Sequence, residues 1–119
     1  MVERKAKLDA TRGNLDLMVL SIVAEEPSYG YRIQQRLADV SRGMLDIKPG
    51  TLYPLLHRLE ADKLIRAKWD GGTGRKRKWY ELTATGKRRL NQQADQWARY
   101  AECLHVLLAP ILEKTPSPT

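Results

Sequence analysis

The chain has 119 residues, which is room for one domain and one further element, and its net charge of +7 favours a polyanion or an anionic surface as partner. Its single cysteine excludes an internal disulfide, in keeping with a reducing compartment. Because no long apolar run or apolar leader is present, we expect a cytoplasmic protein with no membrane partner.

The first third of the chain carries two helical patterns. Residues 1–13 are polar and basic and are predicted to form an N-terminal arm, either flexible or as a frayed leading turn of the helix that follows. Apolar residues with helical spacing then begin at Leu15, after Asn14, which can cap a helix that ends before Pro27. Ser28 is predicted to open a second helix, and Gly43 to end it. The inward positions of this helix are predicted to be Ile33, Leu37 and Val40.

A third helix is predicted to begin at Pro49, because the missing N–H of proline costs nothing at the first helical position. Four leucines are predicted to form its buried face: Leu52, Leu55, Leu56 and Leu59. Residues with polar groups are predicted on the opposite face: Thr51, Tyr53, His57 and Arg58. The helix therefore has one face for a core and one for a partner.

The apolar spacing then changes from about 3.6 residues to about 2, which is typical of strands. Ile65, Ala67 and Trp69 alternate with charged residues, and Tyr80 and Leu82 alternate further on. Between these runs lie a Gly-rich segment and four consecutive cations: Arg75, Lys76, Arg77 and Lys78. This pattern predicts a β-hairpin with a long basic tip, whose cations meet phosphates without a fixed geometry.

Thr83 can cap a final long helix. Its apolar residues recur at alternating spacings of four and three, the heptad pattern of a helix that packs along another helix. They are Leu90, Ala94, Trp97, Ala101, Leu104, Leu108 and Ile111. Pro110 is expected to kink or end this helix, and the tail over residues 113–119 is expected to be disordered.

This order of elements predicts a mainly α fold with a small β-hairpin. It corresponds to a winged helix-turn-helix over residues 14–82, followed by a dimerisation helix over residues 83–112. A third helix of this kind fits a major groove about 12 Å wide, and a basic wing neutralises the neighbouring phosphates. A leucine stripe or a basic loop alone is common in proteins that bind no DNA, so the joint order is what favours double-stranded DNA as the partner.

The sequence resembles the PadR family of transcriptional regulators, in its shorter subgroup. The matching segments are GNLDL at 13–17, YGYRI at 29–33, GTLYPLLHRLE at 50–60, RKWYELT at 77–83, and Gly86. The resemblance implies a homodimer that is held together by the C-terminal helices and the N-terminal helix. It also implies repression of a promoter with an inverted repeat, relieved in many members by a small hydrophobic effector.

The resemblance places the DNA-contacting role on matching positions, to which the helix pattern adds Arg58. They are Tyr29, Gly50, Thr51, Tyr53, Pro54, His57 and the wing residues Arg75 to Lys78. Lys48 departs from the family, many members of which have a capping serine there; it either reaches a phosphate or leaves a weaker helix start. The dimer interface is predicted at Leu15, Leu90, Ala94, Trp97, Ala101, Leu104 and Leu108.

Several assignments keep an alternative. Trp97 is favoured as dimer-core packing, but certain drug-sensing relatives stack flat ligands on a tryptophan of this helix, which makes it the candidate effector residue. Cys103 is favoured as a packed thiol over a redox switch. An enzyme, a metal site or a cofactor is not expected, because His57 and His105 lie on separate predicted helices. The remaining rivals are a winged-helix architectural or protein-interaction module that binds DNA only nonspecifically and, less favoured, an RNA-binding protein.

Overall fold

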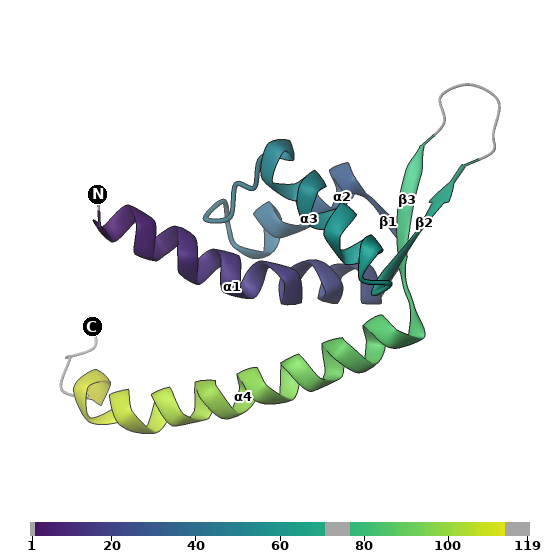
Figure 1. Cartoon of the computed structure of the whole chain (residues 1–119). Coiled ribbons are helices and arrows are strands. Elements are labelled where there is room, and N and C mark those ends of the chain that lie inside the picture. The colour runs from purple at the N-terminus through teal and green to yellow at the C-terminus, as the bar shows by residue number, and fades with distance from the viewer. Residues whose placement is uncertain (1, 71–76, 114–119) are drawn as a thin grey trace.

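The computed structural model describes residues 2–70 and 77–113, with side chains from residue 14 onward. The elements within these residues are α1 (Val2–Glu25), β1 (Ser28–Tyr29), α2 (Gly30–Val40), α3 (Pro49–Ala61), β2 (Ile65–Trp69), β3 (Lys78–Leu82) and α4 (Ala84–Glu113). Figure 1 shows α1, α2 and α3 gathered into one body, which we call the helical body, with β2 and β3 extending from it. Helix α4 runs back beside α1 toward the end where the chain begins.

The core lies between the three helices of the body and the inner face of the sheet. The largest side chains in it are almost completely buried: Val19, Leu20, Ile33, Leu37, Leu52, Leu56, Leu59, Ile65 and Tyr80. Removing one such aliphatic side chain from water contributes about 1.5–3 kcal/mol to stability. The predicted leucine face of α3 is confirmed, since all four of its leucines are buried.

The sheet has three antiparallel strands in the order β1-β3-β2. The predicted hairpin is confirmed, and its register pairs Ile65 with Leu82 and Trp69 with Lys78. The prediction that Ser28 opens a helix is wrong, because Ser28 pairs with Tyr80 in the edge strand β1. A strand of two residues is too short for any period, and a serine before a helical pattern is typical of an N-cap.

Helix α1 begins at Val2, so Asn14 lies within it and does not cap it. The predicted start was wrong because the N-terminal segment lacks an apolar stripe, which was the signal used to locate the helix. That segment nevertheless contains two alanines, two lysines and two arginines, with one leucine and one glutamate, all of which are strong helix formers. Intrinsic propensity therefore extends α1 through the segment that was predicted to be an arm.

Helix α2 ends close to its predicted terminator. Gly43 has a positive φ of 84°, and its amide donates a hydrogen bond to the carbonyl of Ala38 at 2.8 Å. Ile33 and Leu37 are buried as predicted, but Val40 is exposed. Val40 is the last residue of α2 and lines a cavity that α2 shares with α1 and α4, so the inward stripe stops one turn earlier than predicted.

Thr83 caps α4 as predicted, because its hydroxyl oxygen accepts a hydrogen bond from the amide of Gly86 at 2.9 Å. Pro110 does not end the helix, which continues to Glu113. Proline removes one intrahelical hydrogen bond, but an exposed final turn tolerates that loss better than a buried one. The Gly-rich tip with Arg75 and Lys76, and the predicted tail beyond Glu113, lie outside the described residues.

Candidate nucleic-acid interface

Helix α3 presents a polar face opposite its leucines. Thr51, Tyr53 and His57 are exposed as predicted, as are Gly50 in the first turn of the helix and Pro54 in its interior. Pro49 occupies one of the first two helical positions, and Lys48 stands at the N-cap without a side-chain hydrogen bond to the helix. The predicted loss of the side-chain cap is thus confirmed.

Lys48 has a partner of its own. Its Nζ lies 2.9 Å from Asp46 Oδ2, and both side chains are largely exposed. The hydrogen bond and the negative charge of Asp46 raise the pKa of Lys48, so the ammonium is charged at neutral pH. A phosphate at this position would therefore compete with Asp46 for Lys48, since the ion pair is accessible to solvent.

Tyr53 packs its ring against the backbone at the start of α2. A Cβ atom added at Gly30 would lie 2.8 Å from both Cε1 and Oη of Tyr53, which is closer than such atoms approach one another. Glycine at position 30 therefore lets the exposed face of α3 contact the N-terminal end of α2. This contact accounts for two of the motif segments together, because YGYRI supplies the glycine and GTLYP supplies the ring.

A hollow of about 520 Å³ lies where α2, α3 and the wing meet; the wing is β2, β3 and the segment that joins them. We call this hollow the cradle, and its lining residues are Tyr29, Gly30, Tyr31, Arg32, Gln35, Tyr53, Arg77 and Lys78. Four predicted DNA-contacting residues come together here from distant parts of the sequence: Tyr29, Tyr53, Arg77 and Lys78. Arg32 and Gln35 also line the cradle, but the sequence did not predict a DNA contact for either. Both lie on α2, for which only the inward apolar spacing gave a signal.

Arg77 is held in place by aromatic stacking. Its Cζ lies 5.6 Å from the centre of the Tyr29 ring, and that ring stacks on Trp79 with centres 5.8 Å apart. The carbonyl of Arg77 also accepts a hydrogen bond from the amide of Asp70 at 2.8 Å. Among the described residues no carboxylate pairs with Arg77, and its side chain is exposed. Within the described part of the wing, Arg77 is thus a cation with a defined position and no carboxylate partner, whereas we expected no cation there to be fixed.

The other described cations of the wing are paired within the protein. Lys78 Nζ lies 3.4 Å from Glu60 Oε1 and 5.5 Å from the centre of the Tyr80 ring. Arg66 and Lys68 lie 3.4 Å and 3.2 Å from the same carboxylate oxygen of Glu81. Lys78, which was predicted to contact DNA, therefore lines the cradle but directs its charge to the C-terminal part of α3.

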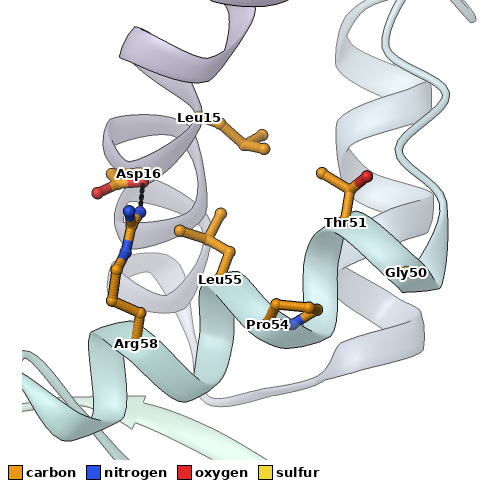
Figure 2. A pocket seen from close by; sticks show the side chains of 7 residues that line it. All are labelled: Leu15, Asp16, Gly50, Thr51, Pro54, Leu55 and Arg58. Atoms are coloured by element: carbon orange, nitrogen blue, oxygen red, sulfur yellow. Dashed lines mark hydrogen bonds and ion pairs between the residues drawn. The ribbon is translucent and has the colours of Figure 1, made fainter.

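Arg58 contacts α1. Its guanidinium lies 2.6 Å from Asp16 Oδ1, beside a hollow of about 390 Å³ between α1 and α3. Figure 2 shows this ion pair together with Leu15 and Leu55, which point into the space between the two helices. Gly50, Thr51 and Pro54 line the other side of the hollow. Arg58 is thus exposed but already paired with α1.

Leu15 does not lie where the dimer prediction placed it. Only 4% of its surface is exposed, and it belongs to the core of its own chain. The reason is its position on α1, where it packs toward α3 beside Leu55. Little of its surface is left for a partner subunit, so the prediction that it contributes to an interface is corrected.

The heptad positions of α4 are open to solvent for most of its length. Trp97 is 50% exposed, and Leu104, Leu108 and Ile111 are also exposed, while Leu90 packs against the core. Cys103 is exposed in the single chain, so its own chain does not pack it, and the packed thiol stays a prediction for the dimer. A cavity of about 450 Å³ lies between α1, α2 and Trp97.

Two other kinds of site were tested in the described part of the chain. No three His, Cys, Asp or Glu side chains there lie close enough together to hold a metal ion, and His57 and His105 are on α3 and α4. No helix in the same residues is sufficiently long and apolar to cross a membrane.

Comparison with known proteins gives a consistent result. The sequence profile of the PadR-like family of transcriptional regulators matches residues 19–92. A transcriptional regulator of Mycobacterium tuberculosis is 37% identical over 81 residues, which cover 68% of this chain and 73% of the relative. A PadR family regulator of Eggerthella lenta has a TM-score of 0.77 and 36% identity, with 90% and 92% of the two chains covered. A PadR-like regulator of Bacillus cereus has a TM-score of 0.75 and 29% identity over 84% and 96%.

Proposed function

The chain belongs to the PadR-like family of transcriptional regulators, and from that premise we propose that it is a homodimeric, cytoplasmic repressor that reads an inverted repeat in duplex DNA. The family and the named relatives are DNA-binding regulators and not enzymes. The observation that carries the proposal is the cradle, in which the outer face of α3 and the start of α2 adjoin a wing arginine that has no carboxylate partner among the described residues.

We assign recognition of the DNA sequence to α3. A helix with a buried leucine face and an exposed opposite face fits the major groove, where each base pair presents a distinct pattern of donors and acceptors. Thr51 and His57 offer hydroxyl and imidazole groups on that face, and the ring of Tyr53 is held against Gly30. A held side chain loses less entropy on binding than a mobile one, which favours Tyr53 as a reader.

The wing supplies phosphate contacts. Arg77 stacks on Tyr29 and has no carboxylate partner in the described part of the chain, so a phosphate can approach its guanidinium without displacing an ion pair. Such contacts release condensed counterions and strengthen binding to any sequence. We therefore assign affinity chiefly to the wing and selectivity chiefly to α3.

The exposed heptad face of α4 supports a homodimer. A continuous row of exposed apolar side chains on a soluble regulator marks an interaction surface, and a second copy offers the same row. A two-fold dimer presents two α3 helices in opposite orientations, which matches an inverted repeat. The row in question runs through Trp97, Leu104 and Leu108.

An effector site beside Trp97 is the second part of the proposal. The cavity of about 450 Å³ is within the usual range for small-molecule sites and is lined largely by apolar side chains, among them Leu17, Met18 and Trp97. In the adjoining hollow, Gln93 Oε1 is buried and has no hydrogen-bond partner among the described residues. We therefore propose a flat apolar effector with a hydrogen-bond donor at one edge.

Tryptophan fluorescence tests the effector site. Planar hydrophobic compounds with a donor group are expected to quench the fluorescence saturably, and Trp97→Ala is expected to remove the saturable part. Trp69 and Trp79 provide a constant background in both proteins. Saturable quenching that is unchanged in Trp97→Ala would exclude the site.

Selection of DNA fragments tests the main proposal. The purified protein is incubated with fragments of its source genome, and the bound duplexes are sequenced. The proposal predicts enrichment of one inverted repeat upstream of a small set of genes. Binding of fragments without any enriched sequence would instead indicate an architectural module that uses the same fold.

A further inference from the structure

We infer that the attachment of α4 to the turn after α3 sets the half-site spacing that the dimer accepts; this rests on the proposed function. The attachment consists of Thr83, Gly86 and the turn residues Lys63 and Leu64, and we call it the junction. Lys63 and Leu64 follow the last turn of α3 almost directly, since α3 ends at Ala61. The junction therefore joins the helix that reads DNA to the helix that carries the dimer row.

Hydrogen bonds from Thr83 close the junction. Its Oγ1 lies 2.7 Å from the carbonyl oxygen of Lys63 and 3.0 Å from that of Leu64, and it accepts the amide of Gly86 at 2.9 Å. The amide of Thr83 donates to the carbonyl of Leu64 at 3.1 Å. One threonine thus binds the turn after α3 and the first turn of α4 at the same time.

Gly86 brings the two backbones into direct contact. A Cβ atom at this position would lie 2.0 Å from the carbonyl oxygen of Leu64 and 2.9 Å from its carbonyl carbon. Both are backbone atoms that cannot rotate away as the end of a long side chain can. Any residue other than glycine would therefore force α4 away from the turn, so the close approach fixes where α4 begins.

A small rotation at the junction has a large effect at the dimer row. With a rise of 1.5 Å per residue, Leu108 lies about 33 Å along the helix from Gly86, so a rotation of about 5° moves it by about 3 Å. One base-pair step is about 3.4 Å along the DNA axis. Because the same rotation occurs in both subunits, a change of a few degrees alters the distance between the two α3 helices by about one base pair or more.

Farther along α4, more space is left between this helix and the helical body. Beside Trp97, cavities of about 450 Å³ and 290 Å³ remain between α4 and the helical body. At the junction, by contrast, backbone atoms touch and the Thr83 hydroxyl is fully engaged. Leu90 also packs against the core, but the closest approach of α4 to its own chain is at its first turn.

The test is a spacing scan with the full chain. Half-sites from the selected inverted repeat are placed on duplexes whose central spacer varies one base pair at a time, and affinities for these and for a single half-site are measured. The variants are Thr83→Val, which keeps the shape and removes the hydroxyl, and Thr83→Ser, which keeps the hydroxyl. Thr85→Val is a matched control, because Thr85 lies on the exposed side of the same turn.

We expect Thr83→Val to remain a dimer in sedimentation and to bind the single half-site within about threefold of the parent. Its preference for the best spacer is expected to fall by about tenfold or to move to another spacer, whereas Thr83→Ser and Thr85→Val keep the parent profile. Gly86→Ala is expected to act in the same direction and more strongly; where it fails to fold, the two Thr83 variants decide.

Two results overturn the inference alone. One is a Thr83→Val dimer with the spacing profile of the parent, and the other is an equal loss of affinity on half-sites and complete repeats, which would indicate general damage. A parent protein that shows no spacing preference on any repeat contradicts the proposed function first, and the inference with it.

Discussion

The helical body and α4 place their apolar residues in opposite ways. In the helical body, Leu20 and Leu56 are completely buried within one chain. In α4, Leu104 and Leu107 are 38% and 65% exposed, although the helix is long and continuous. The helical body buries its apolar side chains within one chain, whereas those of α4 need another surface to cover them. The difference fits the proposed assignment of dimerisation to α4, because the helical body buries its apolar residues without a second chain.

The largest effect is expected from a charge in the dimer row. Leu104→Glu would bury an unpaired carboxylate between two helices, at a cost of about 3–5 kcal/mol to the free energy of association. The dimer is therefore expected to dissociate at micromolar concentrations in sedimentation experiments. Val106→Glu is the matched control, because Val106 is similarly apolar and exposed but lies off the heptad row. Equal dissociation by both variants would contradict the assignment of the row.

The monomeric Leu104→Glu protein allows the stability contributions of the helical body and of α4 to be measured separately. In that background, Leu56→Ala is expected to lower the free energy of unfolding by about 2–5 kcal/mol, because it leaves a cavity in the core of the helical body. Leu107→Ala removes the same atoms from an exposed position and is expected to change it by less than about 0.5 kcal/mol. Urea denaturation measures both, and similar losses would mean that α4 packs elsewhere on its own chain.

Tyr53→Ala tests the reading face of α3. Loss of the ring is expected to reduce the preference for the operator over random DNA by about 1–3 kcal/mol, if Tyr53 contacts a base. Tyr31→Ala is the comparison, because Tyr31 lines the same cradle from α2 and is expected to affect all sequences alike. Operator preference that survives Tyr53→Ala but not the removal of wing cations would show that α3 is not the reader.

Arg77→Ala is expected to have a smaller and less selective effect. It should weaken binding to all sequences and reduce the slope of the log affinity against log salt by about one unit, as for one lost phosphate contact. Lys78→Ala should change that slope less, because the Lys78 ammonium is paired with Glu60. Anisotropy titrations at several salt concentrations measure both slopes, and a larger change for Lys78 would reverse the assignment.

The sequence predicted the features that have a period or a cap. Three such features are confirmed: the leucine face of α3, the hairpin and the Thr83 cap of α4. Each is encoded by residues that are close together in the sequence. Strand β1 was missed because pairing with β3 is a long-range property that two residues cannot encode locally. The start of α1 was missed because propensity without amphipathicity leaves no stripe to detect.

Parts of the candidate site depend on contacts between distant segments. Gly30 against Tyr53 and Arg77 against Tyr29 each join residues from separate motifs, and neither motif alone indicates the contact. For Leu15 the sequence fits two locations equally well, because a leucine on an N-terminal helix suits a dimer interface as well as a core. Only the packing of α1 on α3 decides between the two.

One measurement tests the central claim most directly: the affinity of the purified protein for the selected inverted repeat, divided by its affinity for a duplex of scrambled sequence at the same salt concentration. A dimer that reads sequence through α3 is expected to give a ratio of about a thousand or more, with two chains bound to each repeat. A ratio near one, with binding that depends only on duplex length and salt, would contradict sequence-specific regulation.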